Sequence, residues 1–163
     1  MRTLRFMVDR MLGKLARWLR IAGYDTLHIA DLPVEKDVED DYMAANHEDR
    51  ILLTKDKDLF RRARSVGRPV VLIESNSVGE QLKEVEKIGV KFKPVMDRCS
   101  VCNEFLREPT EEEKKEVLEN EGIEEDLADI YELWYCPRCK KLYWKGSHWE
   151  NMIDFLHKHS VDH

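Results

Sequence analysis

The chain has no apolar run that approaches the roughly 18 residues of a membrane-spanning helix, although 42% of its 163 residues are hydrophobic. It has no Walker-type phosphate loop and no G-x-G-x-x-G motif, which argues against nucleotide-cofactor chemistry. The first residues carry charge inside their only apolar run and are followed by no small-residue cleavage pattern, so secretion is not expected. These absences predict a cytoplasmic protein without a membrane partner.

Cysteine is scarce, but its arrangement is informative. The four cysteines form two C-x2-C pairs and none is left over: Cys99 with Cys102, and Cys136 with Cys139. Two such pairs are what a tetrahedral all-cysteine zinc site needs, since each forms a tight knuckle with two thiolates. Two disulfides are the competing interpretation, but they suit a secreted protein, and thioredoxin-like chemistry needs one pair that opens a helix. The spacing therefore predicts structural zinc.

The net charge of −6 conceals two regions of opposite sign. Residues 108–132 contain twelve acidic residues and two lysines, so this acidic insert carries −10 and the rest of the chain +4. A mildly basic body is compatible with a phosphate-bearing partner. We interpret the insert itself as a solvated helix and loop that separate the two knuckles.

Short apolar runs alternate with helical patterns over the first part of the chain. The predicted strands cover 4–8, 26–29, 51–54, 69–73 and 90–93, and the predicted helices cover 10–22, 37–48, 59–65 and 78–88. This alternation implies an α/β fold, with a mostly parallel sheet covered by helices on both faces. We expect the α/β body to occupy 1–95, a zinc ribbon with the acidic insert to occupy 97–150, and a last helix to run over 149–159.

Acidic residues gather at one predicted edge of the sheet. The carboxyl ends of parallel strands form the ligand edge of such folds. Asp9 follows the first strand, Asp56 and Asp58 follow the third, and the helix after the second strand opens with Asp37, Asp40 and Asp41. Clustered carboxylates repel one another, and a divalent cation such as Mg²⁺ or Mn²⁺ relieves that repulsion and can activate water against a phosphodiester. The alternative is that each Asp is a helix cap or turn residue, which suits Asp37 and Asp58 best.

The first helix carries a basic face opposite its leucine stripe. Its members are Arg10, Lys14, Arg17 and Arg20. Next to an acidic pocket, these side chains would hold backbone phosphates of a nucleic acid. The same pattern is also typical of the solvated face of an amphipathic helix, so it does not decide the function by itself.

Four stretches of sequence, taken in order, resemble a known family. They are residues 7–26 (MVDRMLGKLARWLRIAGYDT), 50–56 (RILLTKD), 98–103 (RCSVCN) and 136–149 (CPRCKKLYWKGSHW). Their order is similar to that of the PIN-like RNase family named for the C-terminal domain of the Mut-seven exonuclease, which couples a PIN-type nuclease fold to a zinc ribbon. The resemblance covers nearly the whole chain. It implies a PIN-like three-layer sandwich, RNA as the substrate and metal-dependent ribonuclease activity.

The resemblance also implies roles for individual residues. Asp9 corresponds to the metal ligand after the first strand, Asp56 to the acid of the Thr-x-Asp motif, and Asp58 to a further acid that some PIN domains use. The middle acid stays open among Asp37, Asp40 and Asp41, with Asp40 preferred because it leaves Tyr42 and Ala45 to face the sheet.

One departure from the ribbon pattern lies in the second knuckle. There Lys140 stands where glycine is favoured, and it should adopt the turn at a modest cost, while Asn103 suits the same left-handed position in the first knuckle.

Two other classes of function remain possible from the sequence. In a non-catalytic RNA-binding or ribosome-associated zinc-ribbon module, the acids would have no catalytic role and the ribbon and basic helix would carry the binding. A phospho-acceptor signalling domain would ordinarily need paired acids after the first strand, and here Asp9 stands alone. The sequence leaves open the oligomeric state and whether cutting is endo- or exonucleolytic.

Overall fold

The structure is a computed structural model of the whole chain, and it describes residues 3–123, 127–159 and 161. Its centre is a four-stranded sheet in the order β2-β1-β3-β4, in which every neighbouring pair is parallel. The strands are β1 (Arg5–Val8), β2 (Asp25–His28), β3 (Ile51–Thr54) and β4 (Val70–Leu72). The predicted α/β class and parallel sheet are confirmed.

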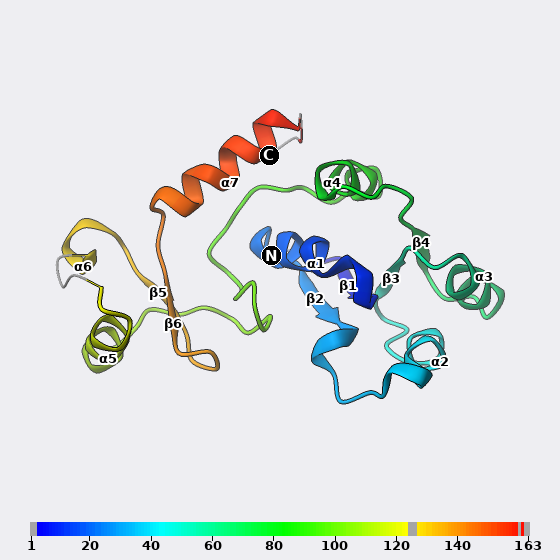
Figure 1. Cartoon of the computed structure of the whole chain (residues 1–163), viewed down its shortest axis with the longest axis horizontal. Helices are drawn as coiled ribbons and strands as arrows, with labels where there is room; N and C mark the ends of the chain where they lie inside the picture. The colour runs from blue at the N-terminus through cyan, green and yellow to red at the C-terminus, as the bar shows by residue number, and fades with distance from the viewer. Residues whose placement is uncertain (1–2, 124–126, 160, 162–163) are drawn as a thin grey trace.

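Helices cover both faces of this sheet, which makes a three-layer sandwich (Figure 1). On one face lie α1 (Gly13–Ile21), preceded by the 3-10 turn η1 (Arg10–Leu12), and α4 (Val78–Glu86). On the other lie α2 (Glu39–Ala45) and α3 (Lys57–Ser65), with the 3-10 turns η2 (Ile29–Asp31) and η3 (Lys36–Val38) in the connection that leads to them. All these helices start at the carboxyl edge of the strands, because each follows a strand along the chain.

The strand residues alternate between the two apolar layers. Phe6 and Val8 pack with α1 and α4, whereas Met7, between them, packs with α2 and α3. The same alternation places Leu53 in the first layer and Leu52 in the second. Strands buried on both faces read as continuous apolar runs, which is why these segments were predictable from the sequence.

Two predicted elements differ from the structure. Residues 90–93 form no strand: Val90 and Phe92 are buried, but the N–H of Lys91 donates to the hydroxyl oxygen of Tyr24 at 2.8 Å instead of to a neighbouring strand. The helix expected over 37–48 is shorter, with η3 leading into α2, which ends where Asn46 adopts an extended conformation.

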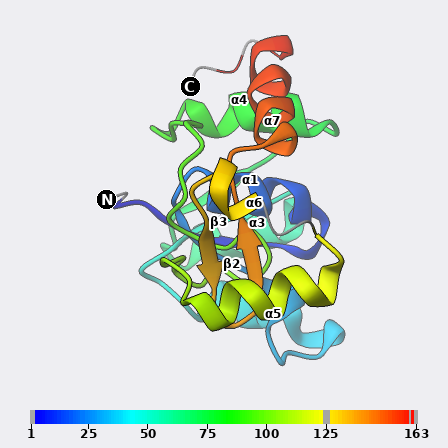
Figure 2. The ribbon, with the colours of Figure 1, turned by 90° about the vertical axis from the view of Figure 1, so that its left-hand side faces the viewer.

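The ribbon lies beside the body and is built around an antiparallel pair, β5 (Trp134–Cys136) and β6 (Lys141–Tyr143). The acidic insert forms α5 (Glu111–Glu121) and the short α6 (Leu127–Ile130), and part of it, 124–126, lies outside the described residues. A capping box between Thr110 and Glu113 starts α5, and Gly122 ends it in the left-handed conformation. Because Val117 and Leu118 pack on Tyr135 and Leu142, α5 covers the ribbon (Figure 2). Most of its acidic residues are exposed.

The helix after the ribbon, α7 (Ser147–Lys158), returns to the α/β body and lies beside α4 (Figures 1 and 2). It begins two residues before the predicted start at 149. The ring of Phe155 stacks on that of Trp18 from α1, with centroids 5.3 Å apart, and Leu156 and Val161 are buried in the same cluster as α1 and α4. This helix therefore packs on the helices α1 and α4 that cover one sheet face.

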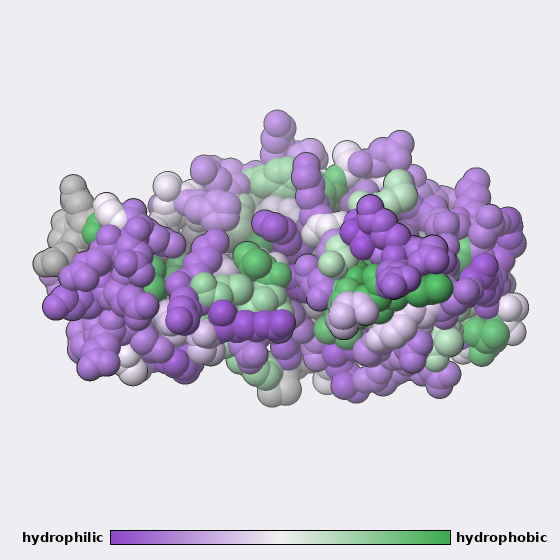
Figure 3. Space-filling model, turned by 60° about the horizontal axis from the view of Figure 1, so that its bottom comes forward, coloured by the Kyte–Doolittle hydropathy of each residue, from purple (hydrophilic) through white to green (hydrophobic). Residues whose placement is uncertain are grey.

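The surface is mostly hydrophilic, with hydrophobic side chains in small separate patches on the face that Figure 3 shows. Among the large hydrophobic residues that the structure describes, the most exposed is Met11, directly beyond Asp9 and Arg10, with 72% exposure. Within the described part of the chain, no helix is both long and apolar enough to cross a membrane.

Candidate functional site

Asp9 occupies the centre of the carboxyl edge, directly after β1. Its N–H donates to the carbonyl of Leu53 at 3.1 Å, which extends the pairing of β1 with β3 by one residue. Its carboxylate is buried and accepts three hydrogen bonds, from the N–H of Met11 at 3.0 Å, the N–H of Lys55 at 3.2 Å and the hydroxyl of Thr54. The side chain is thus held in one orientation at the edge.

Thr54 joins Asp9 to Asp56. Its hydroxyl donates to Asp9 and accepts the N–H of Asp56 at 3.0 Å. Asp56 is the N-cap of α3, where one carboxylate oxygen accepts the N–H groups of Asp58 at 2.8 Å and Leu59 at 3.1 Å. Helix capping and a role in the site are compatible for Asp56, because the cap engages only one of its two oxygens.

Asp40 is electrostatically coupled to both of these acids. It is half-buried in the first turn of α2, and burial raises its pKa above the ordinary value. The negative charges of Asp56 and Asp9 raise this pKa further, while Arg62 opposes them. Asp9 after β1, Asp40 in α2 and Asp56 at the N-cap of α3 therefore form a group of carboxylates whose like charges act on one another.

The other predicted acids do not join this group in the same way. Asp58 is exposed and pairs with Arg61, and Asp41 is exposed and pairs with Arg62. Asp37 is exposed in η3. The reason given above for preferring Asp40 is confirmed only in part: Tyr42 packs against the apolar layer on that face, but Ala45 is exposed, and Met43 and Ala44 are buried instead. The negative charges of Asp9 and Asp56 both act on Asp40.

The carboxylates lie farther apart than a closed metal cage requires. Among the described residues, only the cysteines place three or more potential ligand atoms within 4.8 Å of one another. Mg²⁺ keeps several waters and is often bound through one or two carboxylates plus substrate phosphates, so an open acidic group fits such an ion. The like-charge repulsion at Asp40 is the observation that favours a cation here.

The four predicted basic residues have different surroundings. Arg10 pairs with the buried carboxylate of Glu39 and ties the start of α1 to the start of α2. Arg20 is 3% exposed and does not lie on an open face, since its guanidinium donates to the body and to the ribbon. Lys14 and Arg17 are exposed, and neither forms a hydrogen bond or ion pair with any residue that the structure describes.

The contacts of Arg20 hold the first knuckle against the body. The side chain donates to the carbonyl of Thr26 at 3.0 Å and to the carbonyls of Ser100 and Val101 at 3.2 and 2.9 Å. Asn103 adds a second connection, because its side-chain oxygen accepts the N–H of Thr26 at 3.0 Å. The knuckle thereby occupies the open side of the edge strand β2.

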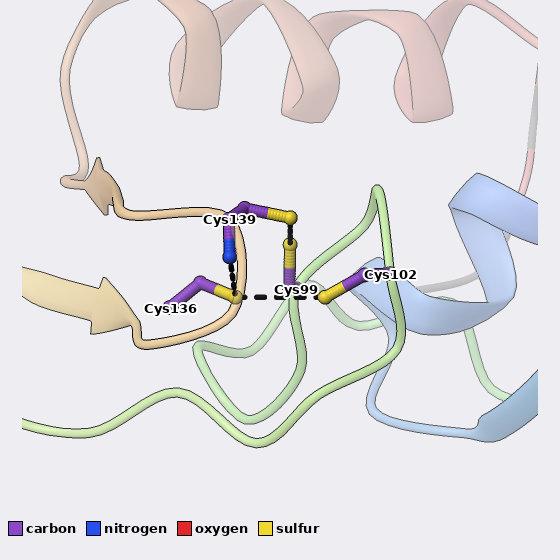
Figure 4. A group of neighbouring side chains, drawn as sticks. All are labelled: Cys99, Cys102, Cys136 and Cys139. Atoms are coloured by element: carbon purple, nitrogen blue, oxygen red, sulfur yellow. Dashed lines mark hydrogen bonds between the residues drawn. The ribbon is translucent and has the colours of Figure 1, made fainter.

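The four cysteines converge from the two knuckles (Figure 4). The sulfurs of Cys99 and Cys139 are 3.9 Å apart and those of Cys102 and Cys136 are 3.5 Å apart, and all four cysteines are free of disulfides. Four sulfurs about 2.3 Å from one tetrahedral Zn²⁺ lie about 3.8 Å from each other. The group is therefore positioned to bind a metal ion and is compatible with a zinc ribbon.

The backbone and the charges of the knuckles suit this role. Asn103 and Lys140, each directly after the second cysteine of its pair, have φ of 75° and 54°, so both adopt the expected left-handed turn. Burial raises the pKa of Cys136 to about 11, since a crowded thiol group resists ionisation without a cation. For Cys99, burial is outweighed by hydrogen bonds from the Tyr143 hydroxyl and nearby N–H groups, and its pKa is lowered. The distance from this hydroxyl to Cys99 Sγ is 3.0 Å.

Three residues of the site were not predicted from the sequence. Thr54 belongs to the Thr-x-Asp motif, which could have indicated its role. Lys55 donates to the carbonyl of Ser75 at 2.8 Å and fixes the loop after β4, and Glu39 binds Arg10. No sequence signal separates Glu39 from its acidic neighbours.

The comparisons with known proteins agree with the resemblance in the sequence. A family model described as the Mut7-C RNAse domain matches residues 4–156. No curated protein and no solved structure matches the chain.

Proposed function

The chain belongs to the Mut7-C RNAse domain family, and on that premise we propose that it is a metal-dependent ribonuclease of PIN type that acts through Asp9, Asp40 and Asp56. The observation that carries the proposal is the coupling of these acids at the carboxyl edge of the sheet, where Asp9 and Asp56 raise the pKa of Asp40 beyond the effect of burial. Asp58 and Asp37 are supporting candidates at the same edge.

Each residue has a distinct task in this proposal. Asp9 is fixed by three hydrogen bonds, and Thr54 sets its distance from Asp56. When bound, Mg²⁺ or Mn²⁺ supplies charge neutralisation and an activated water for hydrolysis of the phosphodiester. Lys14 and Arg17 lie on the helix that leaves the site, and they bind the phosphates of the RNA backbone.

The cysteine group takes structural zinc and contributes no chemistry of its own, because four sulfur ligands leave no open coordination position. Reduced thiols of this kind suit the cytoplasm, where we place the protein. The zinc ribbon assists RNA binding by extending the surface beside α1.

The test is cleavage of labelled single-stranded and structured RNA by the zinc-loaded protein, with and without Mn²⁺. Asp9→Asn should lower cleavage by at least about 100-fold. Asp49→Asn is the matched control, since Asp49 pairs with Arg5 at the opposite edge of the sheet and should leave the rate unchanged. Cleavage that survives unchanged in Asp9→Asn would refute the mechanism.

A second candidate function is a non-catalytic RNA-binding module. One observation favours it, namely that the carboxylates are more widely spread than the cysteine ligands. In that case the protein would bind RNA without cutting any substrate, with or without Mn²⁺, and Asp9→Asn would bind as tightly as the parent protein.

A further inference from the structure

A groove runs beside the edge strand β2, between the α/β body and the ribbon. Its volume is about 310 Å³. The body lines it with His28, at the carboxyl end of β2, and with Leu32, while the ribbon lines it with Val101, Cys102 and Arg138. One end of the groove therefore lies at the edge that carries the acids, and the other lies at the metal-binding knuckles.

Two arginines stand out by their lack of partners. Arg17 and Arg138 are exposed, and the guanidinium group of neither makes a hydrogen bond, ion pair or ring contact with any described residue. Every other arginine that the structure describes has such a contact; the partners range from carboxylates and backbone carbonyls to the ring of Phe60. Unpaired guanidinium groups keep their full capacity for bidentate binding of phosphate.

Arg17 lies on the side of α1 that faces this groove. At 3.6 residues per turn, Gly13, Arg17 and Arg20 fall within about 60° of arc on the helix. A methyl group on Gly13 would lie 3.3 Å from the His28 ring, and Arg20 lines the groove while donating to Ser100 and Val101. Arg17 does not line the groove itself; it lies next to it on α1, about one turn after Gly13 and one turn before Arg20.

Arg138 is positioned by the metal-binding knuckle. It lies between Cys136 and Cys139 in a turn closed by the N–H of Lys140, which donates to the carbonyl of Cys136 at 2.8 Å. A metal ion on the cysteines therefore fixes the backbone that presents this guanidinium.

The charges around the groove favour a polyanion. The one acid that lines it is Asp31, which already pairs with Arg20 at 3.3 Å. The acidic helix α5 lies on the far side of the ribbon strands from the sheet (Figures 1 and 2). The phosphates of a nucleic-acid backbone would thus be attracted to the cationic side chains at the groove and repelled by the acidic residues of α5.

We propose that single-stranded RNA runs from the acidic site along this groove, with Arg138 binding backbone phosphates from the ribbon wall and Arg17 binding them from the adjacent surface of α1. This inference rests on the proposed function, because it takes RNA as the substrate. It assigns the zinc ribbon a specific task, which is to hold Arg138 at a fixed distance from the site.

The experiment measures binding separately from cleavage. The zinc-loaded Asp9→Asn protein, without Mg²⁺ or Mn²⁺, is titrated into fluorescently labelled single-stranded RNA at several salt concentrations. Arg17→Gln and Arg138→Gln should each weaken binding by about 3- to 10-fold and lower the slope of log K against log[salt] by about 0.7. Lys115→Gln is the matched control, since Lys115 is exposed on α5 with no described partner. Arg138→Lys keeps the positive charge, so it should retain the salt slope of the parent protein while it loses part of the affinity, because an ammonium group cannot bind phosphate bidentately.

The outcomes separate this proposal from the ribonuclease assignment. If both glutamine variants bind like the Lys115→Gln control, the groove proposal is overturned, whether or not the parent protein cleaves RNA. If they bind weakly as stated while the parent protein cuts no RNA, the groove stands and the ribonuclease assignment fails. In a cleaving protein, Arg138→Gln should slow the cutting of long RNA and leave a dinucleotide substrate unaffected; equal slowing of both substrates would count against the groove.

Discussion

Arg20 offers the sharpest test of how the ribbon is attached to the body. Replacing it by Met keeps an apolar stem of similar length but removes its hydrogen bonds to the carbonyls of Thr26, Ser100 and Val101. The side chain is 3% exposed, so water cannot replace these bonds without opening the junction. Loss of a buried cation that satisfies several carbonyls costs about 3 to 5 kcal/mol of the free energy of unfolding.

The measurement is thermal and urea denaturation of the zinc-loaded protein. For a chain of this size, such a loss lowers the melting temperature by about 6 to 20 °C. Arg17→Met is the matched control on the same helix, and it should change the free energy of unfolding by less than about 0.5 kcal/mol because Arg17 is exposed with no described partner. Equal stabilities of the two variants would show that the junction does not depend on Arg20. Arg20→Lys should recover little of the lost stability, since one ammonium group cannot reproduce the planar arrangement of donors in the guanidinium group.

Three further predictions concern the two sites. Thr54→Val should lower the rate of RNA cleavage by about 10- to 100-fold, because it breaks the hydrogen-bonded link between Asp9 and Asp56, while the melting temperature should stay within a few degrees of that of the parent protein. A cleavage rate equal to that of the parent protein would exclude that link from the mechanism. Tyr143→Phe should weaken zinc binding by about 10-fold, because Cys99 loses the hydroxyl group that lies 3.0 Å from its sulfur. A competition titration with a chelator measures the zinc affinity, and an unchanged affinity would contradict this role of the hydroxyl. Removal of zinc by a strong chelator should lower the melting temperature, and calorimetry should still show a single unfolding transition, since Arg20 joins the knuckle to the body. Two separate transitions would show that the ribbon and the body unfold independently.

The sheet and the cysteine group could be predicted from the sequence because local patterns determine them. Strands buried on both faces are continuous apolar runs, and β3 was predicted with its observed bounds. Two C-x2-C pairs with no cysteine left over indicate a metal site, which the sulfur distances support.

The sequence could not show which charged side chains would be covered. A helical pattern places Arg20 with Lys14 and Arg17, but the knuckle about 80 residues later covers only the end of α1 where Arg20 lies. Likewise, the pattern placed Tyr42 and Ala45 of α2 toward the sheet, whereas Tyr42 is partly buried, Met43 and Ala44 are buried and Ala45 is exposed. Both differences arise from tertiary contacts that no local pattern records.

The return of α7 to the α/β body has a consequence for the order in which the molecule can be completed during synthesis. The sheet and its first four helices are translated before either knuckle, yet the outer face of α1 and α4 stays uncovered until Phe155, Leu156 and Val161 are added. Both cysteine pairs precede α7 in the chain. All four cysteines are therefore synthesised before α7 can pack on the α/β body, so metal binding does not have to wait for that packing step.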